Sequence, residues 1–343
     1  MSDDGNRADR DATRSAAPVE AAGVGAPRRR TRPGPQQAID PLPSWNDVPS
    51  RQAIVDFVSR VTDHRGSDFV PPAERIATFD NDGTLWCEVP MYAQAAFLVD
   101  RIRALAPDHP DWTRTEPFRS LLVGDVDAVA AAGVHGIASL VAATHAGMTT
   151  DTFAETARNW LATATNPVFG RRYADCTYQP MLEVMAYLRK NAFKTFIVSG
   201  GGADFLRVFA ESTYGVPPEQ VVGSAGKVRF EPRDGEPVLI KLPELDLLDD
   251  GPGKPVGIHR AIGRRPIMAF GNSDGDLEML RWATTGRRPH FAALVHHTDA
   301  SREAAYDRES RVGKLDEALT AAATHGWTIV DMERDWAKIF PAL

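Results

Sequence analysis

Short apolar runs that stop abruptly at polar, glycine-rich segments are the main pattern of this chain. Nearly continuous apolar runs of this length are typical of strands buried on both faces, so the pattern predicts a parallel sheet. The five runs are 75–79, 195–198, 266–270, 291–295 and 328–330.

Apolar positions with helical spacing lie around and between these runs. Strands that alternate with helices predict a doubly wound α/β fold, in which ligands bind beyond the carboxyl ends of the strands. The predicted helices cover 51–62, 181–189, 203–210 and 256–262.

The rest of the chain divides by composition. Residues 1–43 are rich in Ala, Arg, Asp, Gly and Pro without hydrophobic periodicity, which predicts a disordered tail. Residues 44–85 begin the α/β core, and residues 179–343 complete it. Residues 86–178 are Ala-rich, look helical and are too long for a simple crossover. We expect them to form a helical cap over the site.

Composition narrows the class of protein. The 343 residues are 43% hydrophobic and 25% charged, which suffices for a large core, and the net charge of −7 argues against nucleic acid as the main partner. Cys87 and Cys176 are too few for a cysteine-based zinc site, and we expect a cytoplasmic protein. Residues 128–150 carry no Asp, Glu, Lys or Arg, but their Ala, Gly, His and Thr content favours packed helices over a membrane span.

Two carboxylates stand one residue apart where the first run ends. Asp80 is ionised at neutral pH and is able to attack phosphorus, which would give an aspartyl-phosphate. Asp82 suits protonation of the leaving oxygen and later activation of water. Gly83 allows a sharp turn, and Thr84 is a candidate donor to a phosphate oxygen.

A phosphate dianion approaches a carboxylate only when its charge is neutralised. Mg²⁺ prefers oxygen ligands, which Asp80 and residues 272–276 supply. Lys254 offers a second positive charge, and Ser199 with the amide of Gly200 offers neutral donors to phosphoryl oxygens.

These motifs together resemble the haloacid dehalogenase (HAD) superfamily of phosphohydrolases, in particular its phosphoserine-phosphatase-like branch. They occur in the family's order between residues 75 and 279. The resemblance implies a Rossmann-like core with an inserted C1-type cap and Mg²⁺ as cofactor. It implies that Asp80 is the nucleophile and a metal ligand, and that Asp82 is the general acid/base whose backbone carbonyl also binds the metal. Ser199 and Lys254 correspond to the phosphate-binding pair.

The fourth motif departs from the family pattern. Where relatives commonly have Gly-Asp, this chain has Gly271-Asn272, which keeps an amide oxygen but removes one negative charge. Asp276 aligns with the later acidic position, and Asp274 is the alternative. We therefore expect Asp80, Asp82, Asn272 and Asp276 as the metal ligands, with Asp274 ranked below the last two.

Four further side chains near these motifs have ordinary structural interpretations. Trp86 is expected to be packed and Glu88 to be solvated, with contact to substrate as the alternative for both. His296 and His297 are adjacent on a predicted strand, so their side chains diverge and we expect packing or surface roles rather than metal binding.

The sequence therefore predicts a Mg²⁺-dependent phosphatase that hydrolyses a small phosphomonoester through an intermediate on Asp80. Asp82 argues against a dehalogenase, whose leaving group does not require this acid. A phosphomutase or phosphotransferase would use the same intermediate and remains the alternative. A degenerate phosphate-binding module is a weaker one, because Asp80, Asp82, Ser199 and Lys254 are all present.

Overall fold

The computed structural model of the chain describes residues 40–233 and 235–342. The first 39 residues of the expected tail lie outside this range. At the start of the described chain, Leu42 is buried and Asp40 forms an ion pair with Arg51 at 2.5 Å.

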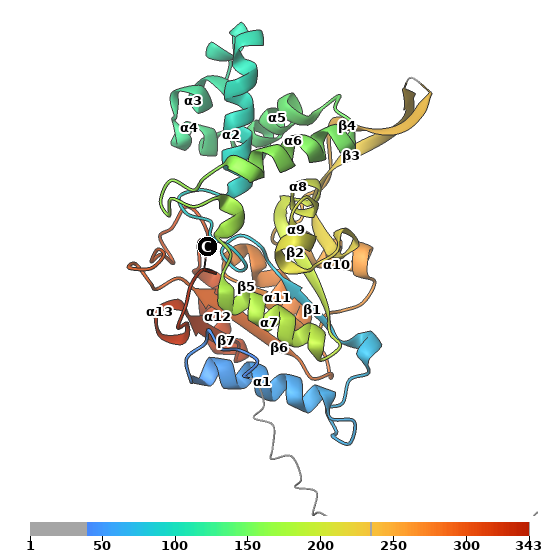
Figure 1. The fold of residues 1–343 in the computed structure, drawn as a ribbon, viewed down its shortest axis with the longest axis vertical. Helices are drawn as coiled ribbons and strands as arrows, with labels where there is room; N and C mark the ends of the chain where they lie inside the picture. The colour runs from blue at the N-terminus through green and yellow to red at the C-terminus, as the bar shows by residue number, and fades with distance from the viewer. Residues whose placement is uncertain (1–39, 234, 343) are drawn as a thin grey trace, which may run out of the picture. The chain divides into compact units, whose positions relative to one another are not determined.

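The described residues form a seven-stranded sheet in the order β4-β3-β2-β1-β5-β6-β7 (Figure 1). Every neighbouring pair is parallel except β3 and β4, which are antiparallel. The five predicted strands are present, so the α/β expectation is confirmed. The strands are β1 Ile76–Phe79, β2 Lys194–Gly202, β3 Val221–Arg233, β4 Glu236–Leu247, β5 Met268–Gly271, β6 Phe291–His296 and β7 Thr328–Asp331.

Helices cover both faces of the sheet. Successive strand residues point to opposite faces, so they join different hydrophobic cores. In β5, Met268 and Phe270 join one hydrophobic core with α1 (Pro49–Thr62) and α7 (Gln179–Lys190). Ala269 joins the other core, with helices α10 (Gly253–Ile262), α11 (Leu277–Ala283) and α12 (Glu317–His325). Three short helices, α8 Ala203–Arg207, α9 Ala210–Tyr214 and α13 Met332–Asp335, complete this part. The doubly wound arrangement is therefore confirmed.

A helical segment lies between β1 and β2, where the long Ala-rich stretch was expected (Figure 1). Leu98 and Ile102 of α2 pack with Phe118, Leu121 and Leu140 in a small core of their own. None of the described helices is both long enough and apolar enough to span a bilayer. The helices are α2 Ala93–Leu105, α3 Phe118–Val123, α4 Val126–Ala131, α5 Gly133–His145 and α6 Thr150–Thr163.

The β3–β4 hairpin was not predicted from the sequence. Figure 1 shows that it runs out from the sheet to the helical segment. There the main chain of Lys241 in β4 accepts a hydrogen bond from Gly147 N and donates one to Met148 O, both at 2.9 Å. The hairpin therefore joins the core to the loop between α5 and α6.

The strand order defines the switch point of the sheet. The chain order runs outward from β1 to β3 on one side and from β5 to β7 on the other. The carboxyl ends of β1 and β5 therefore meet at the switch point where such folds bind ligands. The described chain also contains short 3₁₀ turns at Pro72–Glu74, Ala106–Asp108, Pro110–Thr113, Tyr173–Asp175, Pro218–Gln220 and Asp274–Asp276.

Candidate active site

Lys254 brings two of the predicted carboxylates together. It lies in the first turn of α10, and its ammonium group donates to Asp80 Oδ1 at 2.6 Å, Asp276 Oδ1 at 2.6 Å and Val198 O at 3.0 Å. Only 2% of the lysine is exposed. All three ammonium protons therefore have acceptors inside the protein.

Burial and charge set the protonation of this pair. Burial raises the pKa of Asp80 well above its ordinary value, the neighbouring Asp276 raises it further, and Lys254 opposes both. Burial alone would lower the pKa of Lys254, but the carboxylates of Asp276 and Asp80 raise it above its usual value. Lys254 is therefore a permanent positive charge at the end of β1 and β5.

Asp82 lies two residues after Asp80 in the first motif. Its Oδ1 accepts a hydrogen bond from Trp86 Nε1 at 2.8 Å. Burial raises the pKa of Asp82, although the Trp86 contact works in the other direction. A carboxyl group with a raised pKa retains a proton that it can give to a leaving oxygen. Trp86 is buried and stacks on Phe209, which confirms its expected packing.

The turn between these groups requires a glycine. Gly83 has φ +78°, and a Cβ there would lie 2.1 Å from Asn272 Nδ2. No side chain fits between the first and fourth motifs at this point. Gly83 therefore lets the loops after β1 and β5 pack directly on each other.

Ser199 lies within β2, which continues as far as Gly202. Its Oγ accepts a hydrogen bond from Gly201 N at 3.0 Å and keeps its own proton for donation. A Cβ built on Gly201 would lie 3.2 Å from Ser199 Oγ and 3.8 Å from Asp82 Oδ2, so both groups border the same space. Gly200, the other predicted donor, is exposed beside them.

A residue of the helical segment also reaches this turn. Gln94 of α2 accepts a hydrogen bond from Gly202 N through its Oε1 at 2.6 Å. Gln94 was missed from the sequence, because it lies 108 residues from its partner and belongs to no motif.

Asn272 is the centre of a buried polar network. Its Oδ1 accepts from Thr84 Oγ1 at 3.1 Å, and its Nδ2 donates to Glu88 Oε1 at 2.8 Å. Tyr306 donates to the same Glu88 oxygen at 2.7 Å. Thr84 is fully buried and its hydroxyl orients Asn272, while its expected contact with phosphate stays a prediction. The expectation of a solvated Glu88 is wrong: it is 1% exposed, and burial raises its pKa.

The two acidic residues of the fourth motif have different partners. Asp276 Oδ2 accepts from the backbone N–H groups of Asn272 at 2.9 Å and Ser273 at 3.1 Å. Asp274 Oδ1 accepts from Asp316 N and Ala318 N, both at 2.9 Å, at the start of α12. Asp274 thus holds a helix terminus, whereas Asp276 and Asn272 face the first motif. This arrangement agrees with ranking Asp274 last.

The two adjacent histidines diverge, as expected on a strand. His297 is buried, with Nε2 2.8 Å from Gly83 O and Nδ1 3.2 Å from Glu303 Oε2. His296 lies 3.6 Å from Asp307 instead. His297 therefore supports the turn of the first motif from behind, a role that the sequence did not indicate.

The donor set at this edge fits a hard cation. Asp80, Glu88 and Asp276 are buried and Asp82 is partly buried, and Lys254 pairs directly with Asp80 and Asp276. No three His, Cys, Asp or Glu side chains of the described chain are grouped to hold a metal. The fitting donors are therefore mixed: the Asp80 carboxylate, the Asp82 carbonyl and the Asn272 amide oxygen. Oxygen donors of this kind suit Mg²⁺.

Replacing Asn272 with Asp is expected to destabilise the metal-free protein. The new carboxylate would face Glu88 across a buried contact, at a loss of about 2–4 kcal/mol in free energy of unfolding. The double change Asn272→Asp and Glu88→Gln restores a donor and an acceptor and should recover most of this loss. Urea unfolding in chelator measures both. A single variant as stable as the wild type would contradict the pairing.

Asp249, just before α10, is buried without a hydrogen-bond partner for either oxygen among the described residues. Burial raises its pKa to about 7, and Asp250 adds to this effect. The folded state therefore retains a proton that the unfolded chain loses near its ordinary value of 3.8. This residue's contribution to stability should fall between about pH 4 and 7, by at most about 1.4 kcal/mol per pH unit, and then level off.

The Asp249→Asn variant tests this pH dependence. It should match the wild type at pH 4 and exceed its stability above pH 7, as measured by urea unfolding across that range. A constant difference between the two proteins at every pH would show that Asp249 does not titrate in this way.

Comparisons with known proteins agree with this geometry. The model of the haloacid dehalogenase-like hydrolase family matches residues 77–281, more than half of the chain. The comparison with curated proteins gave no match.

Among solved structures, a conserved functionally unknown protein from Anaerococcus prevotii has a TM-score of 0.51 at 15% identity, over 82% of this chain and 91% of that one. A protein of unknown function from Bordetella pertussis has a TM-score of 0.49 at 14% identity, over 76% and 99%. A phosphoserine phosphohydrolase-like protein from Francisella tularensis has a TM-score of 0.36 at 17% identity, over 64% and 87%. The first similarity shows a shared fold. With its four motifs gathered at one edge of the sheet and the family model spanning them, the chain belongs to the haloacid dehalogenase-like hydrolases.

Proposed function

We propose that this hydrolase is a Mg²⁺-dependent phosphatase that acts on a small phosphomonoester through an aspartyl-phosphate on Asp80. The observation that carries the proposal is the 2.6 Å contact between the Lys254 ammonium group and Asp80, with Asp82 and Ser199 bordering the same space. A nucleophile, an acid and donors for the phosphoryl oxygens are the groups that phosphoryl transfer needs.

The reaction proceeds in two balanced steps. A carboxylate oxygen of Asp80 attacks phosphorus as the bond to the leaving oxygen breaks, and Asp82 gives its proton to that oxygen. In the second step Asp82 takes a proton from water, which attacks the phosphorus of the aspartyl-phosphate. Orthophosphate leaves, Asp80 is regenerated as a carboxylate, and Asp82 is protonated again.

The other residues stabilise charge during both steps. Lys254 and the Ser199 hydroxyl donate to phosphoryl oxygens, which carry the developing charge. Asp80, the Asp82 carbonyl and the Asn272 amide oxygen would hold Mg²⁺, which supplies neutralisation of the phosphate dianion. Asp276 stays the fourth candidate ligand, and its hydrogen bonds hold Lys254 and the fourth-motif turn.

The helical segment after the first motif is proposed as the cap of this site. Gln94 in α2 accepts a hydrogen bond from Gly202 N beside Ser199, and this contact supports the assignment. Exclusion of water by such a cover strengthens electrostatic interactions inside the site. The segment would also decide whether water or an alcohol receives the phosphoryl group.

Hydrolysis of a chromogenic aryl phosphate by the full-length chain tests this function. We expect turnover with Mg²⁺, loss of turnover with chelator, and recovery when Mg²⁺ is added back. Release of one orthophosphate per aryl alcohol supports hydrolysis, whereas formation of an alkyl phosphate from added alcohol would identify a phosphotransferase. Orthophosphate binding without any turnover would instead indicate a binding module.

A further inference from the structure

The tetrapeptide Gly-Arg-Arg-Pro occurs twice in this chain, at residues 263–266 and 286–289. Each copy ends two positions before a strand, β5 in the first case and β6 in the second. Met268 and Phe291 pair in the parallel register of these strands, so the two copies lead into neighbouring strands at the same level. They stand at the amino ends of the strands, at the opposite end from Asp80 and Lys254.

The two copies line a single surface pocket. Arg264 from the first copy lies 3.9 Å from Glu74, and Arg288 from the second also pairs with Glu74. Arg265 lies over the ring of Trp282 at 3.7 Å and donates to Thr285 O at 2.7 Å. Three of the four guanidinium groups are therefore held by named contacts.

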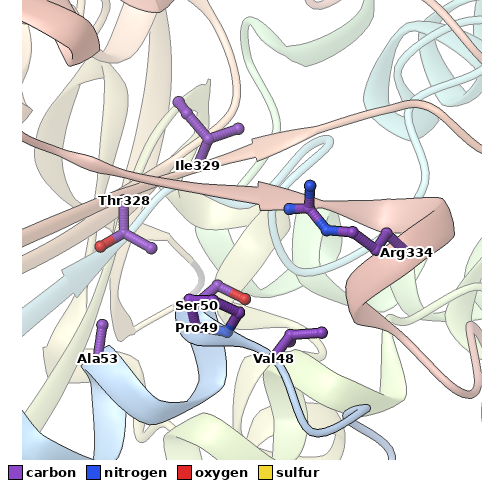
Figure 2. Close-up of a pocket in the computed structure, with 7 residues that line it drawn as sticks. All are labelled: Val48, Pro49, Ser50, Ala53, Thr328, Ile329 and Arg334. Carbon is purple, nitrogen blue, oxygen red and sulfur yellow. The ribbon is translucent and has the colours of Figure 1, made fainter.

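The charge of this pocket is opposite in sign to the net charge of the chain. Its four arginines face one carboxylate, Glu74, which leaves an excess of three positive charges in a chain whose net charge is −7. Another surface pocket, between α1 and β7, shows the contrast (Figure 2). Its lining is apolar or neutral apart from Arg334. The positive charges of neighbouring arginines repel each other, and a bound anion would offset this repulsion.

We propose that the pocket formed by Arg264, Arg265, Arg287 and Arg288 binds a compact polyanion of the diphosphate class. Guanidinium groups bind phosphate oxygens in bidentate fashion, and two arginines from each loop suit two linked phosphates. A single phosphate monoester carries a charge of only about −1.5 to −2 and would leave part of the excess uncompensated. The site is separate from the hydrolytic one and does not depend on the function proposed above.

Calorimetric titration of the full-length chain with pyrophosphate, in chelator, tests the site. The double variant Arg264→Gln and Arg288→Gln should weaken pyrophosphate binding at least tenfold. The matched control is Arg229→Gln with Arg233→Gln, which also removes two arginines that share one glutamate, Glu231. The control should bind pyrophosphate as tightly as the wild type does. Increasing salt should weaken the binding of pyrophosphate to both of these proteins.

Three outcomes would overturn the proposal. Equal affinity for pyrophosphate in the two double variants would show that it binds outside the arginine pocket, for example at the candidate active site, which both variants keep. Binding weaker than millimolar in the wild type would exclude a specific site. Citrate binding as tightly as pyrophosphate would reject the diphosphate assignment. The Arg264 and Arg288 side chains are 56% and 64% exposed, so the double variant should fold, and unchanged aryl phosphate hydrolysis would verify this.

Discussion

Replacing Asp80 with Asn should lower the turnover of an aryl phosphate by at least about 10⁴-fold, the scale seen when a covalent nucleophile is removed. The amide has nearly the same shape and still accepts the hydrogen bond from Lys254, so the fold should persist. It is a poor nucleophile, however, and forms no acyl phosphate. Steady-state release of the aryl alcohol in saturating Mg²⁺ measures the loss.

The matched control is the same chemical change at Asp274. That residue also belongs to the acidic cluster of the fourth motif, but its carboxylate accepts from the backbone at the start of α12. The Asn side chain keeps an oxygen that can accept from the same backbone N–H groups, so Asp274→Asn should keep turnover within a few-fold of the wild type. Comparable turnover in Asp80→Asn and Asp274→Asn would refute the proposed nucleophile.

The sheet and the motif edge were predictable because both depend on local patterns. A run such as residues 266–270 is apolar at every position, which only a strand covered on both faces requires. Parallel strands then place their carboxyl ends together, so Asp80, Ser199 and Asn272 had to lie at one edge. Family membership follows from the same segments.

The parts that were missed depend on contacts between distant segments. The sequence around Glu88 is typical of a surface residue, and its burial is made tolerable by Asn272 and Tyr306, more than 180 positions away. Gln94 has no motif around it. The β3–β4 hairpin escaped because residues 227–233 alternate charged and apolar side chains that stay largely exposed, so no buried run marks the strand.

Removing the ammonium group with Lys254→Met is expected to affect both stability and catalysis. Asp80 and Asp276 would be left buried without their shared base, a loss of about 3–5 kcal/mol in free energy of unfolding. Turnover should fall by about 10²–10³-fold, because the phosphoryl oxygens lose a fixed positive charge. Urea unfolding and aryl phosphate hydrolysis measure the two effects on the same preparation.

Two further variants separate the catalytic effect from the structural one. Lys241→Met removes another buried lysine, which pairs with Asp204 and lies over Phe153, and should destabilise the chain while sparing turnover. Adding Asp276→Asn to Lys254→Met removes one of the orphaned carboxylates, so stability should partly recover while turnover stays low. If turnover recovered together with stability in that double variant, Lys254 would be a structural residue, because the charge that phosphate requires would still be missing.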